Sequence, residues 1–197
     1  MGLTVSSIFL FVNFAENFCV EESMNKTLAD KIKANRKEYH RLLKDSDYTN
    51  VRFNPKNGAL SAIHQEHVFD PKRGKYEIHV QEVGYKYGNA VVLDREPGNI
   101  YKVKYTDGTW NGKQFEISSR ETATPQNIKK GLNHCAGKPN VKIAILYFPN
   151  DNFNIQNFER GLAMYNGIGK SGGKPYCDFE QIICIEGISI IYKKKPL

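Results

Sequence analysis

The sequence predicts an α+β domain in which a mostly antiparallel sheet carries an N-terminal helix and further packing helices. Apolar residues recur at three-to-four spacing in several segments, which is the helical pattern. Short alternating or fully apolar runs, bounded by Gly, Asn and Asp, lie between them and indicate strands. A helix comes first and runs of strands separate the later helices, an order typical of the α+β class. The chain of 197 residues is long enough for one domain with a full core.

Residues 1–24 are interpreted as an N-terminal appendage, and residues 25–197 as a single domain. The stretch from Leu3 to Val12 is apolar but too short to span a bilayer. No Lys or Arg precedes it, as one would in a signal peptide. A weak signal, a start codon assigned too early or the remnant of a larger upstream protein would each explain it, and we favour the last two. No membrane partner is expected.

Amphipathic patterns and turn residues define the first half of the domain. Asn54 to Gly58 is rich in turn formers and predicts a turn. Gly84 can end the helix that is expected at 74–83. In chain order we expect a helix beginning at Asn25 or Thr27, a strand at 59–63, a helix at 74–83 and a strand at 90–93.

The second half contains the strongest single signals. Thr124 followed by Pro125 is a good helix start, with the threonine as N-cap. Val141 to Phe148 is apolar nearly throughout, as in a strand buried on both faces. In chain order we expect strands at 100–105 and 113–118, a helix from 124, a strand at 141–148, a helix at 154–165, and strands at 181–185 and 188–192.

Composition favours a polyanionic partner. Lys and Arg outnumber Asp and Glu by 28 to 21, which gives a net charge of +7. Such a surplus favours nucleic acid, an anionic surface or an acidic protein. The cysteines form no CxxC pair, so a zinc ribbon is not expected, and Cys135 and Cys184 fit core thiols. The segment at 167–173 lacks P-loop spacing and is interpreted as a flexible loop.

Histidines are the first candidates for chemistry. His64, His67 and His79 lie close together in the sequence, and metal-independent RNA cleavage needs a general base and a general acid. The alternative is structural, because His79 shares a predicted helix face with apolar residues and would then be a buried, hydrogen-bonded side chain. A zinc site at His64 and His67 with Glu66 or Asp70 is a further alternative, although the HExxH spacing is absent.

Carboxylates on the predicted hairpin are the second candidates. Many metal-dependent nucleases place an Asp on one strand and Glu-x-Lys on the next, where the acids hold Mg²⁺. Asp107 and Glu116 fit that arrangement, but Ser118 stands at the lysine position. Glu116 therefore remains a candidate acid or base, and an exposed strand carboxylate is the alternative.

The loop and helix after this strand are candidates for phosphate binding. Free N–H groups at a helix N-terminus attract anions, and Thr122 and Thr124 lie at that point. Simple capping is the alternative for these threonines. The residues expected to bind phosphate are Lys102, Lys104, Asn127 and Lys130.

Several segments together resemble a known toxin family. The stretches AIHQEH, GKYEIHVQEVGYKYGNAVVL, WNGKQFEIS, ETATPQNIKKGLNHC and VKIAILYF are similar to the C-terminal tRNase domain of contact-dependent growth inhibition toxins. That domain belongs to the barnase/EndoU/colicin/RelE (BECR) superfamily, and related modules are fused to phage minor head proteins. The resemblance covers about residues 26–148. It implies an α+β RNase fold, no metal, and roles for Glu116, Thr122, Thr124 and Asn127.

The leading hypothesis is a metal-independent ribonuclease that cleaves tRNA, with no cofactor. His64, His67, His79, Glu116, Thr122 and Thr124 are its candidate catalytic residues. An acidic immunity protein would be its partner, and the cytoplasm of the producing or target bacterium its location, after delivery within a larger secreted or phage-associated protein. The alternatives are a non-enzymatic nucleic-acid-binding or structural module of a phage or mobile element, and a metal-dependent DNase.

The excess of basic residues generates a first prediction. RNA affinity should fall steeply as salt rises, because Lys and Arg that neutralise phosphates release counterions. Fluorescence anisotropy of a labelled tRNA between low and physiological salt measures this slope. A flat response, or no binding at low salt, would remove the argument for a polyanionic partner.

Overall fold

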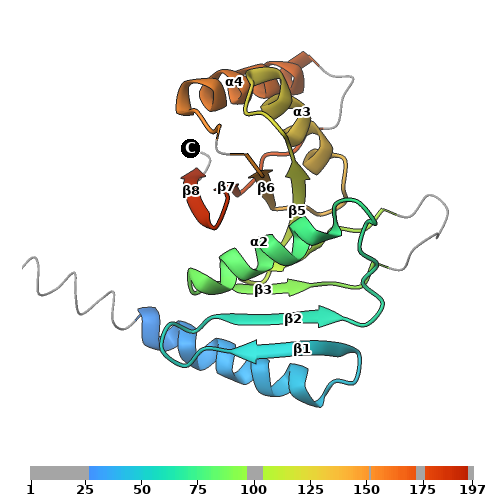
Figure 1. The fold of residues 1–197 in the computed structure, drawn as a ribbon, viewed down its shortest axis with the longest axis vertical. Coiled ribbons are helices and arrows are strands. Elements are labelled where there is room, and N and C mark those ends of the chain that lie inside the picture. The colour runs from blue at the N-terminus through green and yellow to red at the C-terminus, as the bar shows by residue number, and fades with distance from the viewer. Residues whose placement is uncertain (1–26, 97–103, 151, 172–175, 195–197) are drawn as a thin grey trace, which may run out of the picture.

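The computed structural model describes residues 27–96, 104–150, 152–171 and 176–194. Its centre is an 8-stranded sheet whose strands lie side by side in chain order, from β1 to β8. A helix over residues 27–44 packs at one end of the sheet, and two later helices pack near the other (Figure 1). The elements are β1 Tyr48–Phe53, β2 Leu60–His64, α2 Gly74–Lys86, β3 Ala90–Leu93, β4 Gly108–Trp110, β5 Lys113–Ser119, α3 Pro125–Ala136, β6 Ile143–Phe148, α4 Ile155–Ser171, β7 Gln181–Glu186 and β8 Ser189–Lys194.

Strand directions follow from the connections. Within the described residues, the pairs β2–β3, β5–β6 and β6–β7 are parallel, and the other four neighbouring pairs are antiparallel. Parallel neighbours need a crossover, and the helices α2, α3 and α4 supply one each. The predicted α+β class with a mostly antiparallel sheet is confirmed.

Alternation along the strands assigns the helices to the two faces of the sheet. Val91 on β3 and Phe115 on β5 belong to one face, which α2 covers through Val80 and Val83. The opposite face is covered by α3 and α4 over β6 and β7. The helix of residues 27–44 covers that same face over β2 and β3, where Ala90 and Val92 alternate with Val91.

Some element boundaries differ from the sequence-based predictions. Of the strand predicted at 100–105, residues 100–103 lie outside the described residues and 104–105 are not in a strand; the first hairpin strand is β4. Helix α2 continues through Gly84 to Lys86; Gly84 permits close packing on β3, because a Cβ there would lie 2.5 Å from Val91 Cγ2. Helix α4 continues to Ser171, so the loop predicted at 167–173 is wrong for residues 167–171, and residues 172–173 lie outside the described residues. β1 was not predicted.

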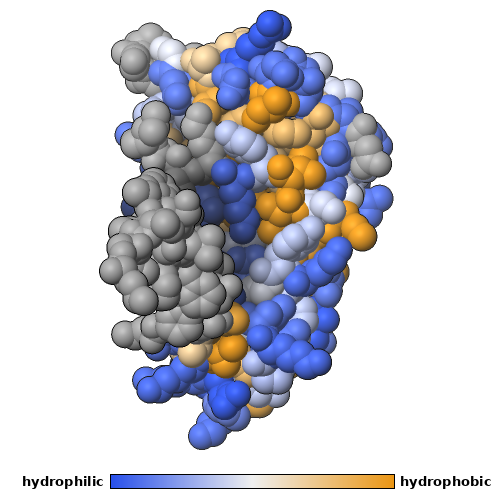
Figure 2. Space-filling view, turned by 90° about the vertical axis from the view of Figure 1, so that its left-hand side faces the viewer, coloured by the Kyte–Doolittle hydropathy of each residue, from blue (hydrophilic) through white to orange (hydrophobic). Residues whose placement is uncertain are grey.

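The described surface is mixed in character. Cys135 and Cys184 are buried free thiols, as predicted. Figure 2 shows hydrophilic side chains over much of one side, with apolar areas between them. Among the described residues, none of the helices combines the length and apolar character that a membrane crossing needs.

The contact between α3 and α4 generates a second prediction. A Cβ at Gly161 of α4 would lie 2.7 Å from Ile128 Cβ and 2.8 Å from the Pro125 carbonyl oxygen, so no larger side chain fits. Gly161→Ala should lower the free energy of unfolding by about 1–3 kcal/mol through overpacking.

Gly167, in the same helix, is the matched control, because among the described residues no atom lies within 4 Å of a Cβ placed there. Gly167→Ala should be neutral or should stabilise the protein by up to about 1 kcal/mol, the difference in helix propensity. Urea denaturation of both variants measures these changes. Equal effects of the two substitutions would contradict the close packing of α3 on α4.

Candidate functional site

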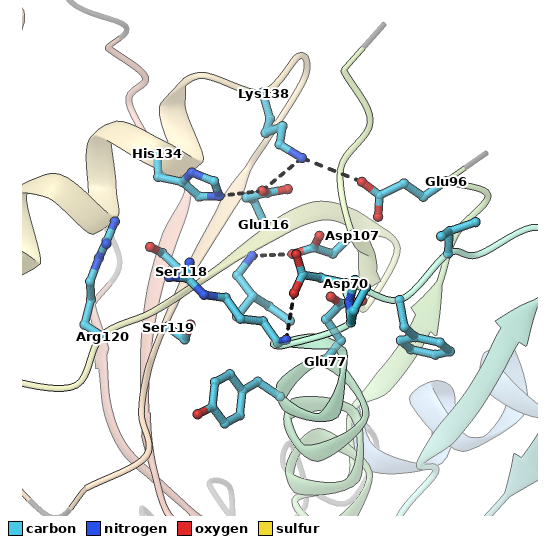
Figure 3. A pocket seen from close by; sticks show the side chains of 16 residues that line it. Asp70, Glu77, Glu96, Asp107, Glu116, Ser118, Ser119, Arg120, His134 and Lys138 are labelled. Atoms are coloured by element: carbon cyan, nitrogen blue, oxygen red, sulfur yellow. Dashed lines mark hydrogen bonds and ion pairs between the residues drawn. The ribbon is translucent and has the colours of Figure 1, made fainter. Parts of the chain in front are cut away.

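A cavity of about 440 Å³ lies where β4 begins, between the start of α2 and the end of α3. Figure 3 shows that acidic side chains occupy its centre and that cationic side chains flank them. Its charged lining residues are Asp70, Arg73, Glu77, Glu96, Asp107, Glu116, Arg120, His134 and Lys138.

The sheet register brings the two central carboxylates together. Gly108 of β4 pairs with Phe115 of β5, and the ladder ends there. One residue further, Asp107 therefore comes opposite Glu116, on the same face. The Asp107 carboxylate replaces the missing ladder partner, since its Oδ2 accepts a hydrogen bond from Ile117 N–H at 2.6 Å. Both acids are almost fully buried.

Glu116 has one satisfied and one unsatisfied oxygen. Its Oε1 lies 3.0 Å from His134 Nε2 and 3.1 Å from Lys138 Nζ. Its Oε2 is buried and, among the described residues, has no hydrogen-bond partner. A buried carboxylate oxygen without a donor is unfavourable, so Glu116 presents an unused ligand atom in a pocket wall.

The pocket shifts the ionisation of several of these groups. Burial, and then repulsion from Glu116, raises the pKa of Asp107 well above its ordinary value. Burial also raises the pKa of Glu96. Burial alone would lower the pKa of Lys138, but the Glu116 carboxylate beside it raises that pKa, so Lys138 carries its charge. Burial and the neighbouring Glu116 carboxylate thus make the ionised form of Asp107 unfavourable in this pocket.

A buried histidine supports the acidic side of the pocket. His67 Nε2 lies 2.8 Å from Glu77 Oε2, and His67 Nδ1 lies 2.7 Å from the Asp94 carbonyl oxygen. One ligand atom from each of His67, Glu77 and Glu96 lies within 4.8 Å of the others, close enough to hold a metal ion. This trio differs from the zinc site considered from the sequence, which used His64 and His67 with Glu66 or Asp70.

His79, one of the candidate catalytic residues, does not line this cavity with Glu116. His79 Nε2 is 2.6 Å from the Gly187 carbonyl oxygen, and its ring packs on Tyr147. His64 lines a separate pocket. A histidine does face Glu116, but it is His134 at the end of α3.

The described members of the other predicted set also lie outside this pocket: Thr122, Thr124, Lys104, Asn127 and Lys130. Thr124 Oγ1 caps α3 by accepting from Asn127 N, and Asn127 Nδ2 donates to Thr122 Oγ1 at 2.7 Å. Capping is therefore their structural role. Lys104 Nζ donates to the Gly137 carbonyl oxygen, Lys130 is exposed on α3, and Lys102 lies outside the described residues.

Sequence reasoning missed Lys138, Glu77 and Glu96. Lys138 lies two residues after Ala136, the last residue of α3, and no sequence pattern links it to Glu116. Glu77 shares α2 with His79, and only the position of α2 against the sheet turns it toward the cavity.

One solved structure shares this fold. It is a chain of the CdiA-CT/CdiI toxin and immunity complex from Burkholderia pseudomallei, with a TM-score of 0.50 and 16% sequence identity. The match covers 71% of this chain and 100% of that chain. No protein-family model and no curated protein matches this sequence. At this identity the likeness shows the fold alone; the nuclease superfamily and the phage fusion implied by the sequence resemblance stay predictions.

The raised pKa of Asp107 generates a third prediction. Above the ordinary value of 3.8, the folded protein holds this proton more tightly than the unfolded chain, so stability falls as pH rises toward the raised pKa. Asp107→Asn cannot ionise, and its amide oxygen can still accept from Ile117 N–H.

In metal-free buffer, the Asn variant should therefore gain stability relative to the wild type as pH rises from about 4 to 8. Thermal melting across this range measures the difference. Asp30→Asn removes a carboxylate from an exposed helix position and should not reproduce the gain. A pH-independent difference for Asp107→Asn would show that Asp107 is not destabilised by its neighbours.

Proposed function

We propose that this chain is a nuclease domain that cleaves a phosphodiester bond of RNA in the pocket around Asp107 and Glu116. The observation that carries the proposal is the buried carboxylate pair, with an unpartnered Glu116 Oε2 and the Lys138 ammonium 3.1 Å from the other oxygen. Two acids and a cation at one point are what phosphoryl chemistry needs, and a binding module needs no such buried set.

The carboxylates suit a divalent cation. Oxygen ligands are those that Mg²⁺ and Mn²⁺ prefer, and a cation would offset the repulsion that raises the pKa of Asp107. Asp107 and Glu116 would hold it, with Glu77 and Glu96 in the same pocket wall. A bound divalent ion polarises the phosphate and lowers the pKa of a bound water. This favours metal-assisted cleavage over the metal-independent mechanism expected from the histidines.

Lys138 supplies the ammonium that the strand pattern lacks. In the pattern Asp, Glu-x-Lys the lysine lies two residues after the glutamate, where this chain has Ser118. Lys138 reaches Glu116 from the end of α3 instead, and its Nζ also donates to the Tyr105 carbonyl oxygen at 2.6 Å. The Lys138 ammonium therefore lies beside the glutamate carboxylate, as the lysine of the strand pattern would, but it comes from the end of α3 and not from β5.

Side chains of the pocket can supply the proton transfers and the charge stabilisation that hydrolysis also requires. Attack by water forms one P–O bond and breaks another; the water proton passes to a carboxylate of the pocket wall, such as Glu96, and the departing oxygen gains a proton. The Lys138 ammonium faces the negative charge that grows on the phosphate oxygens. His134, half exposed beside Glu116, is placed to protonate the departing oxygen.

The choice of RNA rests on the sequence. The basic balance favours a nucleic acid, and the resemblance to toxin tRNase domains favours tRNA. The solved neighbour is named as part of a toxin and immunity complex, which supports a toxin role and an immunity partner here. Because this chain is basic, we expect that partner to be acidic.

A fourth prediction tests the carboxylate pair. Purified protein with total tRNA and Mg²⁺ or Mn²⁺ should yield discrete fragments on a gel. Glu116→Gln and Lys138→Met should each lower the cleavage rate by about 10²-fold or more, since each removes a charge at the reacting phosphate. His79→Ala, outside the pocket, should retain activity. A stable Glu116→Gln protein with full activity would end the proposal.

Chelation separates the two mechanisms. EDTA should abolish cleavage, and added Mg²⁺ or Mn²⁺ should restore it. Cleavage that persists in EDTA but is lost in His134→Ala would instead assign acid–base catalysis to His134. DNA of the same sequence, tested in parallel, shows whether the substrate is RNA.

A further inference from the structure

Arg120 places an unsatisfied cationic donor in the wall of this pocket. It follows β5 directly, and its backbone N–H donates to the Tyr147 carbonyl oxygen at 2.9 Å, which fixes it at the end of the sheet. Its side-chain Nε is buried and has no hydrogen-bond partner in the part of the chain that the structure describes. A buried N–H without an acceptor is unfavourable, so the arrangement suits a ligand that brings one.

A glycine directs this side chain toward Ser118. A Cβ at Gly131 of α3 would lie 3.5 Å from Arg120 Nε and 3.5 Å from Ser118 Oγ. The side chains of Arg120 and Ser118 therefore both lie against Gly131 of α3, which has no side chain of its own. Ser118, at the position where the strand pattern would place a lysine, is buried and lines the cavity.

A second guanidinium stands nearby. Arg73, immediately before α2, lines the same cavity. Burial lowers the pKa of Arg120, and the charge of Arg73 lowers it further. The positive charges of the two arginines therefore repel each other. Within the described part of the chain, neither forms an ion pair with a carboxylate. The Asp70 carboxylate, also in the lining, accepts the backbone N–H groups of Lys72 and Arg73.

We propose that Arg73, Arg120 and Ser118 bind a second phosphate group of the nucleic acid, next to the phosphate that is cleaved. This inference rests on the proposed function. Two neighbouring guanidinium groups with a free buried N–H and a hydroxyl match the several acceptor oxygens of a phosphate.

The two phosphate positions are distinct. Figure 3 shows Arg120 and Ser118 on one side of Glu116, and Lys138 and Glu96 on the other. Ser118 lies two residues beyond Glu116 on β5, about 7 Å along the strand, so an anion at Ser118 is not the one at Glu116. The subsite binds and orients the strand and takes no part in bond breaking. A substrate without a phosphate on that side should bind weakly and be cleaved with a raised KM.

The test is a phosphate scan on protein that carries Glu116→Gln, so that binding is measured without cleavage. Short single-stranded RNAs, each with one phosphate replaced by an uncharged methylphosphonate, are titrated by anisotropy. With Arg120 intact, replacement at one position should weaken binding about tenfold. With Arg120→Gln added, overall affinity should fall by a similar factor and that position should no longer matter.

Salt dependence gives an independent readout and a matched control. Arg120→Gln should reduce the slope of log affinity against log salt by about 0.7, the value for one phosphate contact on a single strand. Arg120→Lys keeps the charge and should keep most of the slope. Arg160→Gln removes the same charge from the exposed side of α4 and should leave the position-specific effect intact.

Each outcome decides the proposal. A position-specific loss that disappears in Arg120→Gln supports it, and Arg73→Gln serves if the Arg120 variant does not fold. A flat scan, or equal effects of Arg120→Gln and Arg160→Gln, overturns it. Protection of the wild type against melting by inorganic phosphate together with a flat scan also overturns it, because the site then takes a free anion. Failure of tRNA cleavage rejects the proposed function separately, since the scan measures binding alone.

Discussion

Backbone pairing between β4 and β5 stops at Gly108 and Phe115, and the carboxylate of Asp107 accepts the next backbone donor, Ile117 N–H. The candidate site depends on this one hydrogen bond. It satisfies a strand N–H that would otherwise be unpaired, and it holds a carboxylate beside Glu116 in the sheet layer. A longer β4 would use that donor in the ladder and would cover the edge of β5 where the cavity opens.

The pocket that results has an acidic part and a basic part. Carboxylates cluster at its centre and toward Glu96, while Arg73 and Arg120 form a cationic end and have no carboxylate partner among the described residues. A polyanion that enters must meet the arginines favourably and the carboxylates unfavourably, unless a cation or a proton offsets the charge there. The same division explains why Lys138 matters, since its ammonium is within 3.1 Å of Glu116.

Much of the fold could be predicted from local patterns, and much of the site could not. Thr124 and Pro125 define the start of α3, and the apolar run before Phe148 defines β6, because capping and burial act over a few residues. Glu116 and Asp107 were recognised on the hairpin through their strand spacing. The contribution of Lys138 was not, because its contact with Glu116 depends on how α3 packs on the sheet.

The histidines also show that the members of the site could not be predicted from local patterns. His79 fits a catalytic residue by type, yet it serves a structural contact with the Gly187 carbonyl oxygen. His134, which faces Glu116, was not among the candidate catalytic residues. The residue type indicates which chemistry a side chain could perform, but its position in the tertiary structure decides whether it can take part.

The helix of residues 27–44 is attached to the sheet differently from α3 and α4. Its buried cluster is small: Leu42 packs on Leu60 and Val92, and the remaining buried members are alanines. The cluster under α3 and α4 contains several aromatic and branched side chains, so it buries far more apolar surface. Local unfolding should therefore start at the N-terminal edge, and amide hydrogens there should exchange with solvent before those of β5 and β6. The carboxylate pocket lies on the slower-exchanging part and would keep its geometry while this edge opens.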